Sequence, residues 1–105
     1  DVLKNFELIG VCNGHNSYIT HFDFSSDNTW IQSNCGAYEL LFFEVQSAEQ
    51  NPSGASELKD TEWNTWTCTL GWPVQGIWPP LADGTDINSV CRSRDKKLLA
   101  TGDDF

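Results

Sequence analysis

The sequence predicts an all-β fold made of short antiparallel strands, and three observations support this. Strand-like runs follow one another closely at residues 18–24, 29–34 and 38–45, with a Ser-Ser-Asp-Asn turn between the first two. The run Leu40–Phe43 is apolar on both faces, which is typical of a strand covered on both sides. A segment with a similar pattern returns 68 residues after the first.

The order of these runs is that of one blade of a WD40-type β-propeller. Gly14-His15 precedes the first run, and in such propellers a Gly-His pair opens a four-stranded unit of roughly 40–45 residues. A blade cannot bury both of its faces without neighbours. The chain is therefore expected to be about one and a half blades of a propeller, a fragment rather than a complete domain.

Each segment can be assigned a place in this scheme. Five segments of residues 1–105 are expected, in chain order: the outer strand of a preceding blade at 6–12, one full blade at 18–70, a polar loop inside that blade at 46–59, a Pro/Gly/Trp loop at 71–85 and the first half of the next blade at 86–105. The fourth strand of the full blade is expected at 62–70. Three Pro and three Gly exclude a regular element at 71–85.

The repeat is visible when residues 19–37 are aligned with residues 87–105 at the offset of 68. The identical pairs are Ile19 and Ile87, Ser25 and Ser93, and Asp27 and Asp95. Because Ser and Asp are turn-forming residues, the matching pairs predict the same turn in both copies.

Charge and hydropathy limit the partners. Fifteen acidic and six basic residues give a net charge of −9, although four of the bases lie together: Arg92, Arg94, Lys96 and Lys97. A negative field repels DNA and RNA, so nucleic acid is excluded as a partner. The basic group fits a solvated turn, with phosphate binding as the alternative. The chain has no run of 18 apolar residues and no segment resembling a signal peptide, so no membrane partner is expected.

The four cysteines allow two interpretations. Two disulfides among Cys12, Cys35, Cys68 and Cys91 would fit a small secreted binding module for a carbohydrate or protein ligand. Reduced, buried thiols fit a propeller instead, and three of the four fall in apolar strand-like runs. No C-x-x-C pair is present, so no zinc site is predicted.

No catalytic site, metal site or cofactor is predicted. His21 lies near Asp23, but no nucleophile motif such as G-x-S-x-G accompanies them. Four aspartates could gather around a cation: Asp83, Asp86, Asp103 and Asp104. The sequence has no twelve-residue calcium loop, however, and aspartates beside strands commonly form turns and caps. The chain is therefore not expected to be an enzyme.

Several stretches resemble the carboxy-terminal propeller of echinoderm microtubule-associated protein-like proteins. They read GHNSYITHFDFS, SNCGAYELLFFEV, TCTLGWPVQGIWP and DGTDINSVCRSRDKKLLATGDDF. The resemblance covers about residues 10–105 and is most specific over Thr67–Phe105. It implies a non-enzymatic role in the cytoplasm, on the microtubule cytoskeleton, with tubulin or its associated proteins as partners. The acidic chain is poorly suited to dock on an acidic microtubule unless other parts of the protein supply positive charge.

The resemblance to WD40 units also implies a network of His, Ser or Thr, Asp and Trp within a blade. The residues that match are His15 and Ser33 in the first unit, with Thr101 and either Asp103 or Asp104 in the second. Ala37 stands at the position of the Asp and Phe43 at that of the Trp, while Asp83 stands where a second His is expected. Both networks are therefore predicted to be incomplete.

Two surfaces are expected to make contacts. The candidate partner-binding loop consists of Trp72, Trp78, Asp83 and Asp86, because exposed Trp is common in binding hot spots. The alternative is that both Trp side chains pack the loop onto the core. An isolated fragment also has unpaired strand edges and open apolar faces such as Leu40–Phe43, so it is expected to self-associate as a homo-oligomer.

Overall fold

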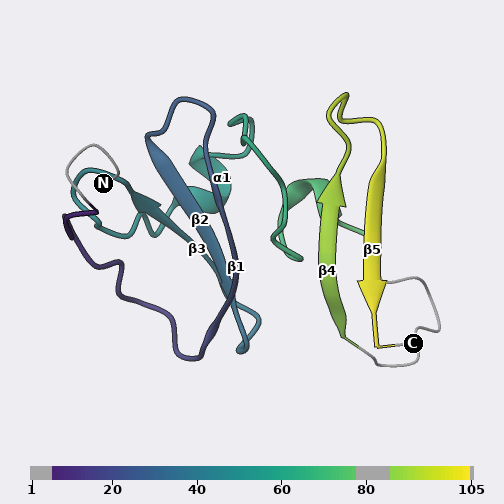
Figure 1. Cartoon of the computed structure of the whole chain (residues 1–105), viewed down its shortest axis with the longest axis horizontal. Helices are drawn as coiled ribbons and strands as arrows, with labels where there is room; N and C mark the ends of the chain where they lie inside the picture. Colours follow the sequence, from purple (N-terminus) through teal and green to yellow (C-terminus); the bar gives the residue numbers. More distant parts are fainter. Residues whose placement is uncertain (1–5, 78–85, 105) are drawn as a thin grey trace.

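The structure is a computed structural model, and it describes residues 6–77 and 86–104. Its strands form two antiparallel sheets that lie side by side along the longest axis of the molecule (Figure 1). The elements are β1 (Ile19–Phe24), β2 (Trp30–Cys35), β3 (Leu40–Glu44), α1 (Gly54–Glu57), the 3-10 turn η2 (Trp72–Val74), β4 (Ile87–Arg92) and β5 (Leu99–Asp103). The predicted all-β class is confirmed.

The β1–β2 and β4–β5 hairpins share one register at the offset of 68 residues. Ile19 pairs with Cys35 in the first hairpin, and Ile87 pairs with Asp103 in the second. Each ladder has an irregularity directly after that first residue. The two hairpins are therefore copies of the same structural repeat.

The turn between the strands is also the same in both hairpins. The Ser25 hydroxyl donates to Asp27 Oδ1 at 2.6 Å, and the Ser93 hydroxyl donates to Asp95 Oδ1 at 2.6 Å. In each turn the backbone amide two residues after the aspartate also donates to that carboxylate, at 3.0 Å. The Ser and Asp pairs that align in the sequence therefore make the same local hydrogen bonds.

The structure differs from the sequence prediction at the two expected outer strands. Residues 6–12 form no strand, since no described segment pairs with them. Residues 62–70 form a single isolated bridge, between Trp63 and Ser25. The amides of Thr67 and Cys68 donate to the side chain of Asp23 rather than to a neighbouring strand. The division of the chain into blades therefore stays a proposal.

The expected open face at Leu40–Phe43 is corrected by the structure. Phe42 is 6% exposed and Phe43 is 1% exposed. The short helix α1 lies within the predicted polar loop, and a Cβ at Gly54 would come within 2.5 Å of the Phe42 ring. Exposed apolar side chains are found elsewhere, including Phe6 and Leu8 before the first sheet, at 77% and 78% exposed, and Phe22 and Phe24 on β1, at 58% and 40% exposed.

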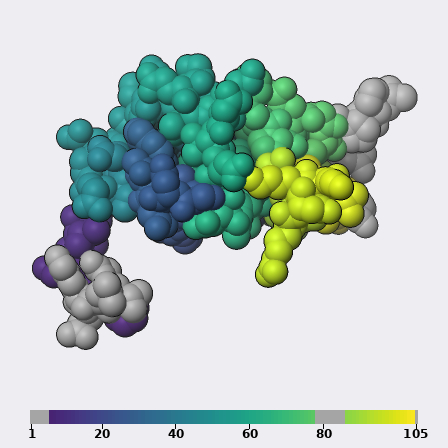
Figure 2. All heavy atoms as spheres, turned by 90° about the horizontal axis from the view of Figure 1, so that it is seen from above, coloured from purple at the N-terminus to yellow at the C-terminus, as the bar shows by residue number. Residues whose placement is uncertain are grey.

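The main core lies between the two sheets. Residues 62–77 pass through this space, as the teal and green atoms in Figure 2 show. The buried residues Trp66, Val74 and Val90 form its centre, and the surrounding apolar residues are Trp63, Ile77, Ile87 and Leu99. The Trp66 indole donates to the Cys68 carbonyl at 2.8 Å, so its polar atom is satisfied inside the core.

Gly71 is a position of this segment at which a larger residue would meet Trp66. Its φ is +129°, and a Cβ there would lie 2.4 Å from Trp66 Cζ2. We predict that Gly71→Ala lowers the free energy of unfolding by more than the roughly 1–3 kcal/mol that such a backbone conformation costs a non-glycine residue. Urea unfolding measures the loss.

The matched control for this substitution is Gly76→Ala. Gly76 also has a positive φ, +85°, but no atom lies within 4 Å of its Cβ position. It should lose only the backbone contribution. Equal losses at Gly71 and Gly76 would show that contact with Trp66 does not constrain this segment.

Candidate functional site

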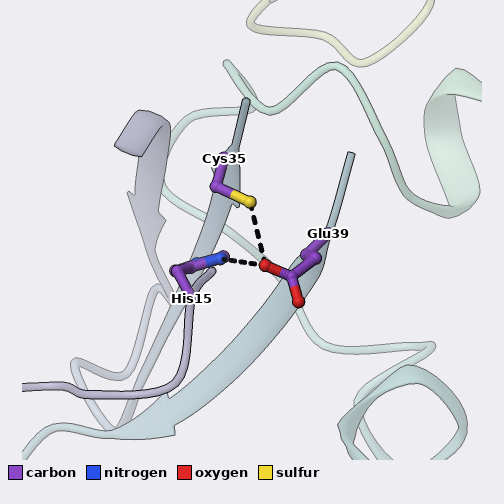
Figure 3. Close-up of side chains that lie close together, drawn as sticks. All are labelled: His15, Cys35 and Glu39. Carbon is purple, nitrogen blue, oxygen red and sulfur yellow. Dashed lines mark hydrogen bonds and ion pairs between the residues drawn. The ribbon is translucent and has the colours of Figure 1, made fainter. Parts of the chain in front are cut away.

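His15 lies against the three-stranded sheet and contacts two of its strands. Its Nε2 atom is 2.7 Å from the Ser33 hydroxyl on β2. Its ring centroid is 6.3 Å from that of Phe43 on β3. The other ring nitrogen, Nδ1, faces Glu39 Oε1 at 3.6 Å (Figure 3). Two residues matched by position in the sequence are therefore in contact.

Glu39 is held ionised by its hydrogen-bond donors. The backbone amide of Asn16 donates to Oε1 at 2.9 Å, and the Asn16 side chain donates to Oε2 at 2.8 Å. The Cys35 thiol donates to Oε1 at 3.0 Å. The Asn16 amide first, and then the Cys35 thiol, lower the pKa of Glu39 to about 2.

Glu39 is the residue that sequence reasoning missed. Alignment placed Ala37 where an aspartate is expected, and its amide donates to Cys35 Sγ at 3.3 Å. Glu39 stands two residues later, and its longer side chain brings a carboxylate to the histidine. The signal available in the sequence was an acidic residue, Glu39, two positions after the one where the aspartate is expected. Phe43 occupies the place of the Trp and contacts His15 by packing alone.

The corresponding residues of the second hairpin occupy equivalent places in the ladder, with Thr101 where Ser33 stands and Asp103 where Cys35 stands. Thr101 pairs with Val90 in the β4–β5 ladder, and Asp103 pairs with Ile87. Asp104 accepts a hydrogen bond from the Asn88 side chain at 2.6 Å. Asp83, expected at the histidine position, lies outside the described residues. A role for these residues in a blade network stays a prediction.

Asp23 is the buried acid of the molecule's first sheet, at 1% exposed. Its carboxylate accepts hydrogen bonds from the Thr65 hydroxyl at 2.7 Å, the Thr67 amide at 2.9 Å and the Cys68 amide at 3.1 Å. The Gln32 side chain donates to it from β2 at 3.0 Å. Burial alone would raise the pKa of Asp23, but the hydrogen bonds, led by that of Thr65, lower it below its ordinary value.

Trp72 is neither buried in the core nor free at the surface. It is 45% exposed. Its indole N–H donates to the Ala55 carbonyl of α1 at 2.8 Å, and Lys59 Nζ lies 4.7 Å from the centre of its ring. These contacts place one edge of the ring against the α1 region and leave another edge in solvent. Trp78, the second Trp of the candidate loop, lies outside the described residues.

Asp86 is the acid of the candidate loop that lies within the described residues, and it links segments next to the two sheets. It accepts a hydrogen bond from the Tyr38 hydroxyl at 2.8 Å. Tyr38 precedes β3, and Asp86 directly precedes β4. This exposed contact raises the pKa of Tyr38, because the hydrogen bond and the negative charge of Asp86 both favour the protonated phenol. Asp86 therefore has a partner within the chain.

A cavity of about 710 Å³ opens beside Trp72. Its apolar wall includes Phe42, Trp63 and Trp66, and its basic side chains are Lys59, Arg92 and Lys96. This volume lies in the range of roughly 300–1,000 Å³ that is usual for ligand pockets. The cavity combines aromatic surface with three basic side chains and two acidic ones, Asp60 and Glu62.

The cysteines carry no disulfide. Cys12, Cys35, Cys68 and Cys91 are all free thiols. Cys35 and Cys68 are buried as expected, whereas Cys12 and Cys91 are exposed, contrary to the expectation. Burial first, with the nearby charge of Asp23, raises the pKa of Cys68. The secreted-module interpretation required two disulfides, so the structure gives it no support.

The helices of the described residues are short. None of them has both the length and the apolar character that a membrane-spanning helix requires.

Two hairpins repeat one register, and His15 contacts Ser33 within the first unit, which is the arrangement of strands found in the blades of a β-propeller. Comparison with known families agrees. All of residues 1–105 match the family described as echinoderm microtubule-associated protein second beta-propeller. The chain belongs to the echinoderm microtubule-associated protein family, and the resemblance seen in the sequence is confirmed.

Curated relatives give the same result. The chain is 49% identical over 102 residues to the 77 kDa echinoderm microtubule-associated protein of Lytechinus variegatus. The aligned residues are 97% of this chain and 15% of that protein. The chain is 49% identical to human echinoderm microtubule-associated protein-like 1. It is 47% identical to echinoderm microtubule-associated protein-like 4 of Xenopus laevis, and both alignments cover 97% of this chain. It spans 12% and 11% of their lengths.

Removing the charge of Asp23 tests its structural role. We predict that Asp23→Asn lowers the free energy of unfolding by about 2–4 kcal/mol. The amide NH₂ of asparagine can only donate, so it cannot replace the carboxylate oxygen that accepts hydrogen bonds from the amides of Thr67 and Cys68. Urea unfolding at neutral pH measures this loss. The control is Asp27→Asn, which removes an exposed turn carboxylate instead. A smaller loss for Asp23→Asn than for Asp27→Asn would contradict the prediction.

The pH dependence of stability gives a second test of Asp23. Because its pKa is lower in the folded chain than in the unfolded chain, its contribution is complete above the unfolded value near 4. The contribution is lost as the pH falls through the lower folded value. We predict that, as the pH falls below about 4, wild-type stability falls more steeply than that of Asp23→Asn. Parallel curves would show that the carboxylate does not stabilise the fold.

Proposed function

We propose that this chain is a non-enzymatic interaction segment of a microtubule-associated protein in the cytoplasm. The observation that carries the proposal is the match of all 105 residues to the second propeller of the family. Three relatives at 47–49% identity have the name echinoderm microtubule-associated protein or echinoderm microtubule-associated protein-like. The proposed partners are tubulin or other proteins of the microtubule cytoskeleton.

The use of polar side chains inside the fold supports a scaffold role. Asp23 holds residues 65–68 against the first sheet through hydrogen bonds. His15 contacts Ser33, and Glu39 binds the backbone of Asn16. Groups that could serve catalysis are thus engaged in fixing one segment of the chain to another.

The cavity beside Trp72 is the surface that we assign to the partner. It carries Lys59, Arg92 and Lys96, balanced in part by the acidic residues Asp60 and Glu62. Lys96 pairs with Glu62 at 3.0 Å, which leaves Lys59 and Arg92 as the remaining positive groups among the lining residues. An aromatic surface with local positive charge suits an acidic partner, although the chain as a whole is negative.

Truncating the exposed tryptophan tests this surface. We predict that Trp72→Ala, alone or with Trp78→Ala, weakens co-sedimentation of the intact protein with microtubules at physiological salt by about tenfold or more, since an interface Trp at a hot spot contributes at least about 2 kcal/mol. Tyr18→Ala is the control, because Tyr18 is another large aromatic side chain, 74% exposed, and it does not line the cavity.

The outcomes separate the parts of the proposal. Loss of binding in Trp72→Ala but not in Tyr18→Ala, with both variants folded by circular dichroism, supports the cavity as the partner surface. Unchanged binding by the Trp variants places the microtubule contact elsewhere. A wild-type protein that does not co-sediment would contradict the microtubule assignment.

We further propose that the exposed face of β1 packs against a neighbouring part of the propeller, or against a second copy when the chain is isolated. The ring centroids of Phe22 and Phe24 are 6.0 Å apart on this face, and both side chains are exposed. Exposed apolar side chains gathered on one strand face favour association.

Light scattering of the isolated chain tests this association. We predict a mass above the 11.8 kDa of one chain, and a shift toward that mass in the double variant Phe22→Ser, Phe24→Ser, because the apolar contact is removed. Leu98→Ser is the control, since Leu98 is exposed on the other hairpin. A monomeric wild-type chain would contradict the proposal.

A further inference from the structure

Three different ligand atoms meet at the edge of the first sheet. The side chains of His15, Cys35 and Glu39 point toward one another, with the Glu39 carboxylate next to both the ring nitrogen and the sulfur (Figure 3). Their ligand atoms all lie within 4.8 Å of one another. Cys35 Sγ is 3.0 Å from Glu39 Oε1, and His15 Nδ1 is 3.6 Å from the same oxygen.

The histidine nitrogen in this cluster lacks a hydrogen-bond partner. The His15 side chain is 6% exposed, and its Nδ1 atom is buried. A separation of 3.6 Å from Glu39 is too long for a hydrogen bond. A buried nitrogen without a hydrogen bond is costly, so the direction of Nδ1 toward the Glu39 carboxylate calls for a physical explanation.

The opposite side of the ring is already arranged as metal-binding histidines require. His15 Nε2 lies 2.7 Å from the Ser33 hydroxyl. When Nε2 carries the proton and donates to Ser33, Nδ1 presents its lone pair to the cluster. A histidine that binds a metal usually donates its other N–H to a neighbouring oxygen in this way.

We propose that His15 Nδ1, Cys35 Sγ and a Glu39 carboxylate oxygen bind one Zn²⁺ ion. Nitrogen, sulfur and carboxylate oxygen are the three ligand types that zinc takes in proteins. A tetrahedral zinc ion with bond lengths of about 2.0–2.3 Å separates its ligands by roughly 3.3–3.7 Å. The separations of Glu39 Oε1 from Cys35 Sγ and from His15 Nδ1, 3.0 and 3.6 Å, lie close to this range, and the histidine and cysteine ligand atoms lie within 4.8 Å of each other.

The charges also favour a divalent cation. Binding converts the Cys35 thiol to a thiolate and releases one proton to solvent. The thiolate and the Glu39 carboxylate then carry two negative charges, which neutralise the two positive charges of the ion. The Ala37 amide, 3.3 Å from Cys35 Sγ, is placed to donate to the thiolate. Three protein ligands leave the fourth position of a tetrahedral zinc ion for water.

Sequence reasoning missed this site because its ligands come from three separate segments. His15 precedes β1, Cys35 ends β2, and Glu39 precedes β3. Only Cys35 and Glu39 are near in sequence, and a Cys-x-x-x-Glu spacing is not a recognised zinc motif. The absence of C-x-x-C therefore did not exclude zinc.

Titration of the full chain with Zn²⁺, and with Co²⁺ as a coloured substitute, tests the proposal. We expect one ion per chain and, for Co²⁺, the near-ultraviolet absorption band of a cobalt–thiolate bond. Cys35→Ser should remove that band, and Glu39→Gln should weaken Zn²⁺ binding by tenfold or more. Cys91→Ser is the matched control, because it removes an exposed thiol on β4 and should change neither result.

A variant that retains all three ligands guards against a loss of folding. Ser33→Ala removes the hydrogen bond to His15 Nε2, and such partners usually contribute 10–100-fold to metal affinity. We expect weaker Zn²⁺ binding by that factor, with an unchanged circular dichroism spectrum of the metal-free chain. Absence of Zn²⁺ binding by the wild-type chain, or a cobalt–thiolate band that persists in Cys35→Ser, would overturn the proposal.

Discussion

The buried carboxylate of Asp23 is the interaction on which the rest of the structure depends. It accepts hydrogen bonds from the backbone and side chains of residues 65–68, which are more than forty positions away in the chain. These bonds fix the segment that carries Trp66 into the space between the two sheets, where it packs with Val74 and Val90. Because a buried charge is costly without partners, the carboxylate and its donors require each other.

The repeat was predictable from the sequence because it depends on local chemistry. The pairs Ser25 and Asp27, and Ser93 and Asp95, make the same turn from neighbouring residues, so alignment alone finds them. The path of residues 62–70 was not predictable. Their apolar pattern resembles a strand, but Asp23 accepts hydrogen bonds from the amides of Thr67 and Cys68, and such tertiary context overrides local strand preference.

The candidate functional site shows the same contrast between what local sequence pattern predicts and what tertiary contacts decide. His15 and Ser33 were found by position because they occupy a repeated pattern, and they are in contact. Glu39 was missed since a longer side chain, two positions later, reaches the same place. Cys35 was interpreted as a small apolar residue, whereas its sulfur donates to Glu39. Local sequence pattern therefore locates the repeated positions. Which side chains contact one another at those positions depends on side-chain length and on the geometry of the fold.

Amide hydrogen exchange measured residue by residue tests the central role of Asp23 most directly. If its carboxylate docks residues 65–68 onto the sheet, the amides of Thr67 and Cys68 will exchange at neutral pH as slowly as those of the β1–β2 ladder. Their protection will then fall as the carboxylate is protonated in acid. Exchange of both amides at the rate of exposed loop amides, with the ladder still protected, would contradict this account.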